Sequence, residues 1–484
     1  MVKSVGARSA IGHGDGRMQQ GGSASEPPCA RGSRLSTFTP ESAAALPGPA
    51  WLQRRRSAAA EAFASSVLPS EKDEVWRYSR IDQLDLDRYR PSGIDPVVPS
   101  NDPGPSPSDR VHSLVDSLGP RSGLMVTLDG VLATVASSLG DDLLTLGRAG
   151  EQDAQRGLLG SVASDPHDFV LLNDAFAVDP LVIDVAPGAT IGDPIVVVHV
   201  VSGTGGDAIF PRTVIRCGGA SKAGVIEIVV DMDAGLLAGL PPTAVGGAPE
   251  SADSAPEHLV APVTEILLAD EGALDYVSVQ ALGPRTWQLG HQASAIGAEA
   301  TLESFAVALG GSYARLRTDS VLQGASGTSK LRAAFIGRDD QMLDFRTLQD
   351  HLGPRTTSDL LFMGAVADHS HSVYSGLIRV RRGAVRSDAM QTNHNLVLDE
   401  GAHADSVPNL DIEENDVKCS HGSTVGPVDE DQRYYLESRG VEPAVAERLI
   451  VGGFFEDIAD QVPIAGTRSM IGRALADRIG VHGA

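Results

Sequence analysis

A cysteine and a histidine stand two residues apart in the segment Val417-Lys-Cys-Ser-His-Gly422. Because successive side chains of an extended segment point to opposite faces, Val417, Cys419 and His421 are expected to share one face. A thiol and an imidazole are donors that suit zinc or the iron of an iron–sulfur cluster. Such a cluster usually takes about four protein ligands, so the pair alone does not complete a site.

The chain holds only three cysteines, Cys29, Cys217 and Cys419. If Cys419 and His421 bind a cluster, the remaining ligands must come from another chain, or the cluster must be short-lived. The alternative is structural, with Cys419 as a small buried hydrophobe and His421 as a hydrogen-bonded residue at a strand end. Three widely spaced cysteines also form no disulfide framework, which favours a reducing compartment.

A second group of candidate ligands is rich in histidine. His369 and His371 would share one face of a strand, and His394 and His403 follow at a distance that fits neighbouring coils. This spacing would allow a four-histidine metal cage, but no carboxylate or cysteine stands at a fixed spacing from it, which disfavours the cage. The alternative is that these are solvated or structural histidines.

Three acidic residues, Asp399, Glu400 and Asp405, are candidates for paired carboxylates in an extended groove. Polysaccharide lyases or hydrolases with a β-helix fold would use such a pair. An aromatic content of 4% counts against this carbohydrate-active enzyme, because sugar platforms need ring faces. No Gly-x-x-x-x-Gly-Lys-Ser/Thr motif occurs, so this chain is expected to bind no nucleotide itself.

Short β-branched runs must position these residues. They begin at Leu181-Val-Ile-Asp-Val185 and continue to Ser375-Gly-Leu-Ile-Arg-Val380, bounded by Gly, Pro or Asp and with almost no helical pattern between them. Such an array indicates a sandwich, a barrel or a stacked β-solenoid. No Asn-Gly hairpin turn occurs, which favours the solenoid, although no strict sequence period is visible.

Composition divides the chain into four parts. We expect a disordered tail over residues 1–36, a helical or α+β region over 37–180, a β core over 181–428 with a surface insertion over 231–262, and a helical domain over 429–484. In the last part Asp429 starts one helix, Gly440 ends it and Pro443 starts the next. The apolar stripe expected on that next helix consists of Val445, Leu449, Gly453 with Phe454, and Ile458.

The net charge of −24 and the pI near 4.8 argue against nucleic acid or an anionic membrane as partner, since both require a basic face. No apolar run of about 18 residues or more occurs, so no transmembrane helix is expected. Residues 1–36 lack the apolar segment of a secretory signal. Together these features predict a cytoplasmic protein.

The segment from Val417 to Gly426, preceded by Pro408-Asn-Leu-Asp-Ile412 and followed by Tyr434-Tyr-Leu-Glu-Ser-Arg-Gly440, resembles the SufB/SufD family, scaffold subunits of the SUF iron–sulfur cluster assembly machinery. The segments His371-Ser-Val-Tyr-Ser-Gly-Leu-Ile-Arg-Val380 and Gln391-Thr-Asn-His-Asn-Leu396 fit the same family. The chain is more similar to the SufD branch than to the SufB branch, whose segment carries Cys-x-His-Glu where this chain has Gly422.

The resemblance implies a mainly β protein with a right-handed parallel β-helix core, acting as a scaffold and not as an enzyme by itself. In the family the histidine matched by His421 lies at the interface with SufB and helps a nascent cluster form. The resemblance therefore implies a transient iron–sulfur cluster at an interchain site, with His421 as a metal ligand shared with the partner chain and Cys419 beside it.

The partners that the resemblance implies are a SufB-like chain, or a second copy of this chain, and the ATPase SufC. SufD-like proteins present their C-terminal helices to SufC. The residues expected to dock the ATPase are Tyr434, Tyr435, Leu449, Phe454 and Phe455.

Overall fold

The computed structural model describes residues 37–93, 107–149, 157–163, 167–202, 205–232 and 258–480. The tail predicted over residues 1–36 lies outside them, as does most of the insertion predicted over 231–262. His258–Val260, at the end of that insertion, forms a buried strand, β10, so the prediction is wrong there. This strand pairs in parallel with β7 (Asp207–Ile209) and β13 (Thr286–Ile296). These two strands supply its backbone hydrogen bonds, and the local sequence pattern does not predict them.

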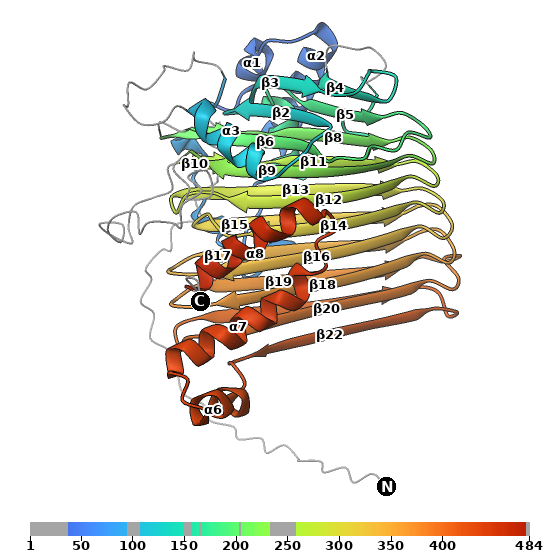
Figure 1. The fold of residues 1–484 in the computed structure, drawn as a ribbon. Helices are drawn as coiled ribbons and strands as arrows, with labels where there is room; N and C mark the ends of the chain where they lie inside the picture. Colours follow the sequence, from blue (N-terminus) through green and yellow to red (C-terminus); the bar gives the residue numbers. More distant parts are fainter. Residues whose placement is uncertain are drawn as a thin grey trace, which may run out of the picture. The chain divides into compact units, whose positions relative to one another are not determined.

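Two large sheets form the body of the protein (Figure 1). Sheet A contains, in spatial order, β21 (His403–Ile412), β19 (His371–Val380), β17 (Met342–His351), β15 (Tyr313–Leu322), β13 (Thr286–Ile296), β11 (Val263–Leu268), β8 (Arg212–Cys217), β5 (Leu181–Val185) and β4 (Leu144–Arg148), with β1 (Arg90–Pro91), β7 (Asp207–Ile209) and β10 joined at its side. Sheet B contains β22 (Lys418–Gly426), β20 (Asp388–Val397), β18 (Thr357–Val366), β16 (Thr328–Gly337), β14 (Thr301–Ala308), β12 (Ala273–Ala281), β9 (Lys222–Asp231), β6 (Ile195–Val201), β2 (Gly123–Leu128) and β3 (Val131–Ser137).

From β11 onward successive strands alternate between the two sheets, and from β5 onward neighbours within each sheet run parallel. This is a β-solenoid of about seven turns, which confirms the predicted parallel β-helix. The length of a coil is uneven. Residues paired in sheet A are 26 apart at Trp287 and Tyr313, 29 apart at Tyr313 and Met342, and 32 apart at His371 and His403.

Alternation along each strand separates an inner from an outer face. The inner face of the middle coils is apolar and aromatic, with Phe335, Phe345 and Phe362 stacked from successive coils. Gly364 is required there, because a Cβ at this position would come within 2.0 Å of the Phe335 ring. The outer faces are also apolar, so each needs a second layer to exclude water.

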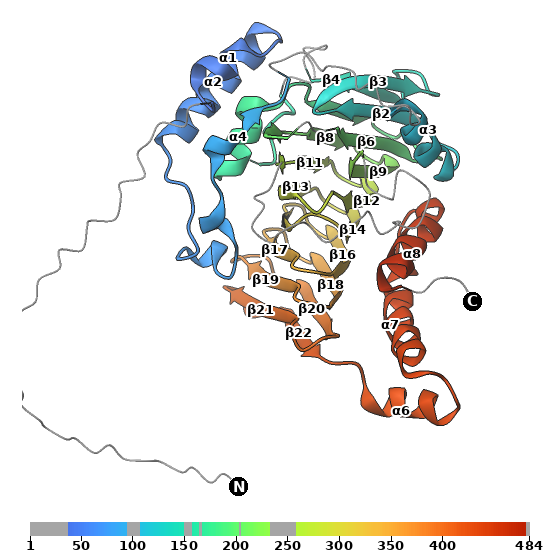
Figure 2. The same cartoon turned by 90° about the vertical axis from the view of Figure 1, so that its left-hand side faces the viewer.

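Helices and turns supply that second layer on opposite sides (Figure 2). The outer face of sheet A is covered by residues 38–89 together with α4 (Asp168–Phe176). The first of these regions contains α1 (Pro40–Ala45), α2 (Ala50–Ser65) and three short 3-10 turns, Glu74–Trp76, Ile81–Gln83 and Leu86–Arg88. The outer face of sheet B is covered by α3 (Pro107–Ser117), α7 (Pro443–Ala459) and α8 (Ala465–Ile479). The helix α6 (Glu430–Ser438) buries no residue, and no described helix is both long and apolar enough to cross a membrane.

Helix α7 faces the solenoid with residues that match the predicted stripe only in part: Ile458 of that stripe is fully buried and Phe454 is partly buried. Val451, Phe455 and Ile458 pack on sheet B, whereas Leu449 of the predicted stripe is exposed. The helix has apolar residues around most of its circumference, so helical periodicity did not single out the buried face. Asp429 and Gly440 do act as predicted: Asp429 caps the N-terminus of α6, and Gly440 follows it with a φ of 88°.

A column of left-handed residues follows one corner of the solenoid. Each of these residues has a positive φ and donates its backbone N–H to a carbonyl at the same corner of the next coil. The donors are Ala220, Glu271, Glu299, Ser326, Arg355 and Arg386, and their acceptors are Asp270, Ala298, Ala325, Pro354, Val385 and Asp416. A non-glycine residue in this conformation costs roughly 1–2 kcal/mol, and the hydrogen bond to the neighbouring coil offsets part of it.

Candidate functional site

The last coil of the solenoid ends both sheets. β21 is the terminal strand of sheet A and β22 the terminal strand of sheet B, and in the described part of the chain no strand pairs with their outer edges. Nearly every residue of β22 is exposed. We call this surface, made by β21 and β22, the open end. Backbone N–H and C=O groups along such an edge are available to another chain.

The predicted pair Cys419 and His421 lies on β22 at this open end. In the register of sheet B, Cys419 is the neighbour of Ala389 and His421 is the neighbour of Gln391, and both neighbours point into the solenoid. The two side chains therefore share the inner face, as the sequence predicts. Because no further coil follows, the inward-pointing imidazole of His421 is exposed, while Cys419 stays half-buried beside Val417.

The two described cysteines differ in burial, but burial raises the thiol pKa of both. Burial raises the pKa of the Cys217 thiol to about 12, so this residue behaves as an inert core side chain. Burial, with a smaller contribution from Asp388, also raises the pKa of the Cys419 thiol. A thiol in this state needs a metal ion or a cation from outside the described residues to become a thiolate ligand.

Polar side chains line the interior next to His421. Gln391 is fully buried, and no described residue hydrogen-bonds either atom of its amide. It is packed against Gly376 and Tyr374, since a Cβ on Gly376 would lie 2.7 Å from Gln391 Oε1 and 2.3 Å from the Tyr374 hydroxyl. Glycine at position 376 thus makes room for a polar layer directly inside the open end, which sequence reasoning missed.

Apolar side chains surround this polar centre. Leu410 and Ile412 of β21 and Val425 of β22 also occupy inner-face positions and are exposed because the coil that would cover them does not follow. Ser423 donates a hydrogen bond of 2.7 Å to Ser406 and so ties the two terminal strands together. A metal cargo at this end would find one thiol and one imidazole in the described chain, which is half of an ordinary ligand set.

The four histidines do not form one cage, which is the outcome that the sequence favours. His369 lies in the turn before β19 and His394 lies on sheet B, so neither shares a face with the other two. His371 and His403 do come together, and Asp405 joins them, with His371 Nε2 2.8 Å from Asp405 Oδ2.

The carboxylates proposed for a carbohydrate enzyme have other partners. Asp399 lies in the turn before β21 and accepts the backbone N–H of Asp368 at 2.7 Å, whereas Asp405 lies between the two imidazoles of His371 and His403. This arrangement offers no support for the paired catalytic acids of a lyase or hydrolase.

The residues predicted to dock an ATPase fall into two groups. Tyr434 and Tyr435 on α6 and Leu449 on α7 are exposed, with 73% of the Tyr434 surface accessible. Phe455, by contrast, is a core residue packed on sheet B, and Phe454 is partly buried against it. We therefore correct the predicted set by removing Phe455 from the accessible surface.

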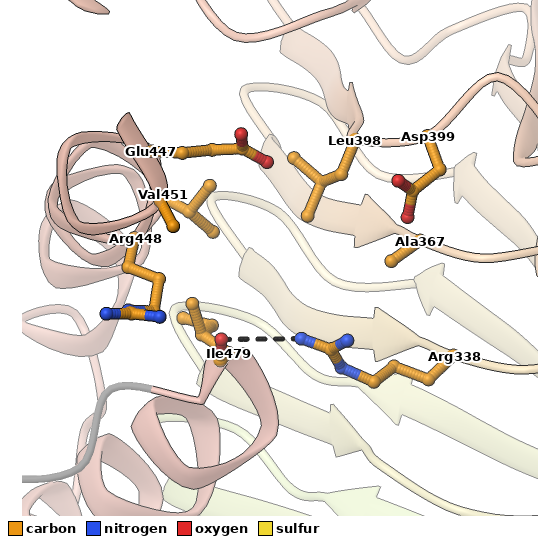
Figure 3. Close-up of a pocket in the computed structure, with 9 residues that line it drawn as sticks. Arg338, Ala367, Leu398, Asp399, Glu447, Arg448, Val451 and Ile479 are labelled. Atoms are coloured by element: carbon orange, nitrogen blue, oxygen red, sulfur yellow. Dashed lines mark hydrogen bonds between the residues drawn. The ribbon is translucent and has the colours of Figure 1, made fainter. Parts of the chain in front are cut away.

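A cavity of about 220 Å³ lies between the C-terminal helices and the turns of the solenoid (Figure 3). Arg338 crosses its floor, with Nε donating to the carbonyl of Arg478 at 2.7 Å and Nη2 to that of Ile479 at 3.3 Å. In Figure 3 Glu447 of α7 points toward Leu398 and Asp399. A cation at a helix C-terminus is favourable, so Arg338 fastens the last turn of α8 to the solenoid.

Comparison with known proteins gives the family. Residues 199–454, more than half of the chain, match the model described as SUF system FeS cluster assembly, SufBD core domain. The chain is 34% identical over 219 residues to an iron–sulfur cluster assembly SufBD family protein of Mycobacterium tuberculosis, which covers 44% of this chain and 55% of that protein. Against this relative the chain thus spans about half of the relative's length.

Two further relatives carry the name iron–sulfur cluster assembly protein SufD. The protein of Escherichia coli is 24% identical over 418 residues, which are 85% of this chain and 89% of that protein. The protein of Bacillus subtilis is 30% identical over 213 residues, which are 43% of this chain and 48% of that protein. The match to the core model includes β22 with Cys419 and His421, and the chain belongs to the SufBD family of iron–sulfur cluster assembly proteins.

Proposed function

We propose that this protein is a SufD-type scaffold subunit that joins a SufB-like chain through its open end and is moved by the ATPase SufC through its C-terminal helices. The cluster is cargo that forms at the junction of the two scaffold chains. The observation that carries the proposal is the exposure of His421 on an inner-face position of the last coil, at an edge where strands of a second chain can pair.

The distribution of exposed apolar side chains supports both contacts. Among the described residues, eight of the fifteen exposed large hydrophobic side chains fall between residues 390 and 449. They are Met390, Val407, Leu410, Ile412, Val425, Tyr434, Tyr435 and Leu449. Concentrated apolar exposure of this kind is typical of interaction surfaces, because it is costly in water.

His421 supplies the chemical argument. An imidazole nitrogen can ligate iron or accept a proton, and an exposed ring at an interface can share a metal with ligands of the partner chain. Cys419 precedes His421 by two residues on the same face, is less exposed, and is a second donor once a metal displaces its proton. The incomplete ligand set of this chain is then completed by the partner.

The first experiment replaces His421 by Ala in the complex of this chain with its SufB-like partner and SufC. Because the side chain is exposed, the complex should still assemble and the unfolding temperature should stay the same. The amount of iron–sulfur cluster formed, measured by absorption and by iron and sulfide content, should fall at least about tenfold. His369→Ala, which removes an exposed imidazole from a turn, is the control. An unchanged cluster yield in His421→Ala defeats the assignment.

The second experiment tests the docking surface with point substitutions. Deleting residues 434–484 is unsuitable, because Val451 and Phe455 belong to the core. Tyr434→Ala combined with Leu449→Ala removes only exposed side chains, so the protein should remain folded while its affinity for SufC falls at least about tenfold. Val67→Ala, which shortens an exposed side chain after α2, is the matched control. Full retention of SufC by the double variant contradicts the proposed docking surface.

A further inference from the structure

The outer face of sheet A carries a cluster of metal-ligating side chains that the proposed function does not use. His371 is the first residue of β19 and His403 the first residue of β21, and the two are direct neighbours in the parallel register. Asp405 follows His403 by two residues and therefore points to the same face. The fold thus brings together three ligands that are 32 and 34 residues apart along the chain.

The distances between the donor atoms fit one bound ion. His371 Nε2 lies 2.8 Å from Asp405 Oδ2, and His403 Nε2 lies 3.3 Å from Asp405 Oδ1. All three donor atoms lie within 4.8 Å of one another. An ion with bonds of about 2.0–2.2 Å holds adjacent ligands roughly 3.0–3.5 Å apart, so small side-chain rotations are sufficient.

The surroundings also suit an ion. On one side, the register places His371 beside Met342 and Asp405 beside Val373, two buried apolar residues that exclude water. On the other side the cluster is open, since the side chain of His403 is 67% exposed and those of His371 and Asp405 are 25% exposed. A half-shielded site with an open approach leaves coordination positions for water.

We propose that His371, His403 and Asp405 bind one divalent transition-metal ion, such as Fe²⁺ or Zn²⁺. Two imidazoles and one carboxylate select these metals over Mg²⁺ and Ca²⁺, which prefer sets of oxygen ligands. The bound ion links β21 to β19 and so fastens the terminal strand of sheet A to the coil before it. This site is separate from His421, which lies on sheet B, and it does not depend on a partner chain.

The alternative is a carboxylate that only shares hydrogen bonds with two imidazoles. The full-length protein, titrated with Co²⁺ as a coloured probe, distinguishes the two. We expect one equivalent of Co²⁺ to bind with visible absorption, Zn²⁺ to displace it, and Mg²⁺ to have no effect. Zinc should also raise the unfolding temperature, because an ion that binds the folded chain stabilises it.

Substitutions locate the ion. His403→Ala removes a mostly exposed side chain, and Asp405→Asn keeps the shape but not the charge; each should weaken Co²⁺ binding at least about tenfold and remove the stabilisation by zinc. His369→Ala and His421→Ala should bind as the unmodified protein does. The proposal is overturned if the unmodified protein binds no Co²⁺, if His403→Ala and Asp405→Asn bind it unchanged, or if His421→Ala alone abolishes binding.

Discussion

The two ends of the solenoid are built from the same kind of coil but finish differently. At the end nearer the N-terminus, β3 and β4 run antiparallel to β2 and β5, and a bulge between Val126 and Thr127 bends the pairing. The inward-facing Met125 and Leu144 are completely buried there. At the open end the strands stay parallel, and inward-facing residues such as His421 are exposed.

The side chains that line the interior of the solenoid also differ between the two ends. Near the closed end, defined by β3 and β4, the inner face is lined by Ile183, Val185 and their apolar neighbours. Near the open end it is lined by amides and hydroxyls, including Gln391 and Ser372, whose polar atoms no described residue hydrogen-bonds. A protein that only needed to prevent edge-to-edge aggregation would protect both ends. The difference supports the proposal that a second chain associates with the open end.

The largest effect is expected from breaking the ion pair near the closed end. Glu265 is fully buried, holds Arg212 at 2.5 Å and accepts three backbone N–H groups, from Gly160, Val162 and Ala163. Glu265→Ala leaves the buried Arg212 with Asp174, at 3.1 Å, as its remaining charged partner among the described residues, and leaves three backbone N–H groups without their acceptor; it should lower the free energy of unfolding by about 3–5 kcal/mol. Glu413→Ala, at the exposed open end, should change it by less than about 0.5 kcal/mol. Urea denaturation measures both, and equal losses contradict the comparison.

A pH effect of intermediate size is expected from a histidine inside the solenoid, two coils before the open end. Burial, opposed by the charge of Asp350, lowers the pKa of His351 to about 4. In the unfolded chain the histidine pKa is near 6.5, so between about pH 6.5 and pH 4 the unfolded chain binds a proton at this residue and the folded chain does not. The free energy of unfolding therefore falls as the pH decreases through this range. The loss reaches at most about 3 kcal/mol.

His351→Gln isolates this effect, because the amide can replace the imidazole in its bonds to Thr356 and Ser358. Between pH 6.5 and 4 the free energy of unfolding should become less dependent on pH in this variant. His369→Gln, which changes an exposed histidine, should leave the dependence unaltered. If both variants follow the unmodified protein, the acid sensitivity comes from other groups.

The smallest effect on stability is expected from lysine substitutions on the terminal strands at the two ends of the solenoid. At the open end the same substitution should have a large effect on association. Val425 at the open end and Val135 at the closed end are exposed to a similar extent, 45% and 49%. Val425→Lys should weaken pairing with a SufB-like chain at least about tenfold, because an edge lysine opposes strand addition. Val135→Lys should leave pairing intact, and both should change stability by less than about 0.5 kcal/mol. Co-purification and size-exclusion chromatography give the answer.

Much of the strand content could be predicted, but the residues that pair between successive coils could not. The run Leu181-Val-Ile-Asp-Val185 coincides with β5, and the runs up to Val380 each correspond to a strand. The spacing between paired residues varies from 26 to 32, because the turns differ in length, so no fixed period marks the coils. The outer faces are also buried, which blurs the alternation that would reveal inside and outside.

The candidate site was predictable only as far as local geometry reaches. Strand alternation placed Cys419 and His421 on one face. Their exposure depends on β22 belonging to the last coil, and no short sequence segment shows that a coil is the last one. The pairing of His371 with His403 depends on register across a whole coil. The polar layer at Gln391 had one signal, Gly376, since a glycine within a strand often marks a close approach.

The corner column of left-handed residues sets the order in which the molecule should come apart. Each donor makes its hydrogen bond to the coil that follows. Arg386 bonds to Asp416 at the last corner, whereas all the later coils lie between Ala220 and the open end. Local unfolding should therefore begin at the open end and proceed toward the closed end, one coil after another. Amide protons along this column should exchange with deuterium fastest at Arg386 and slowest at Ala220. When a second subunit binds the open end, these exchange rates should become similar.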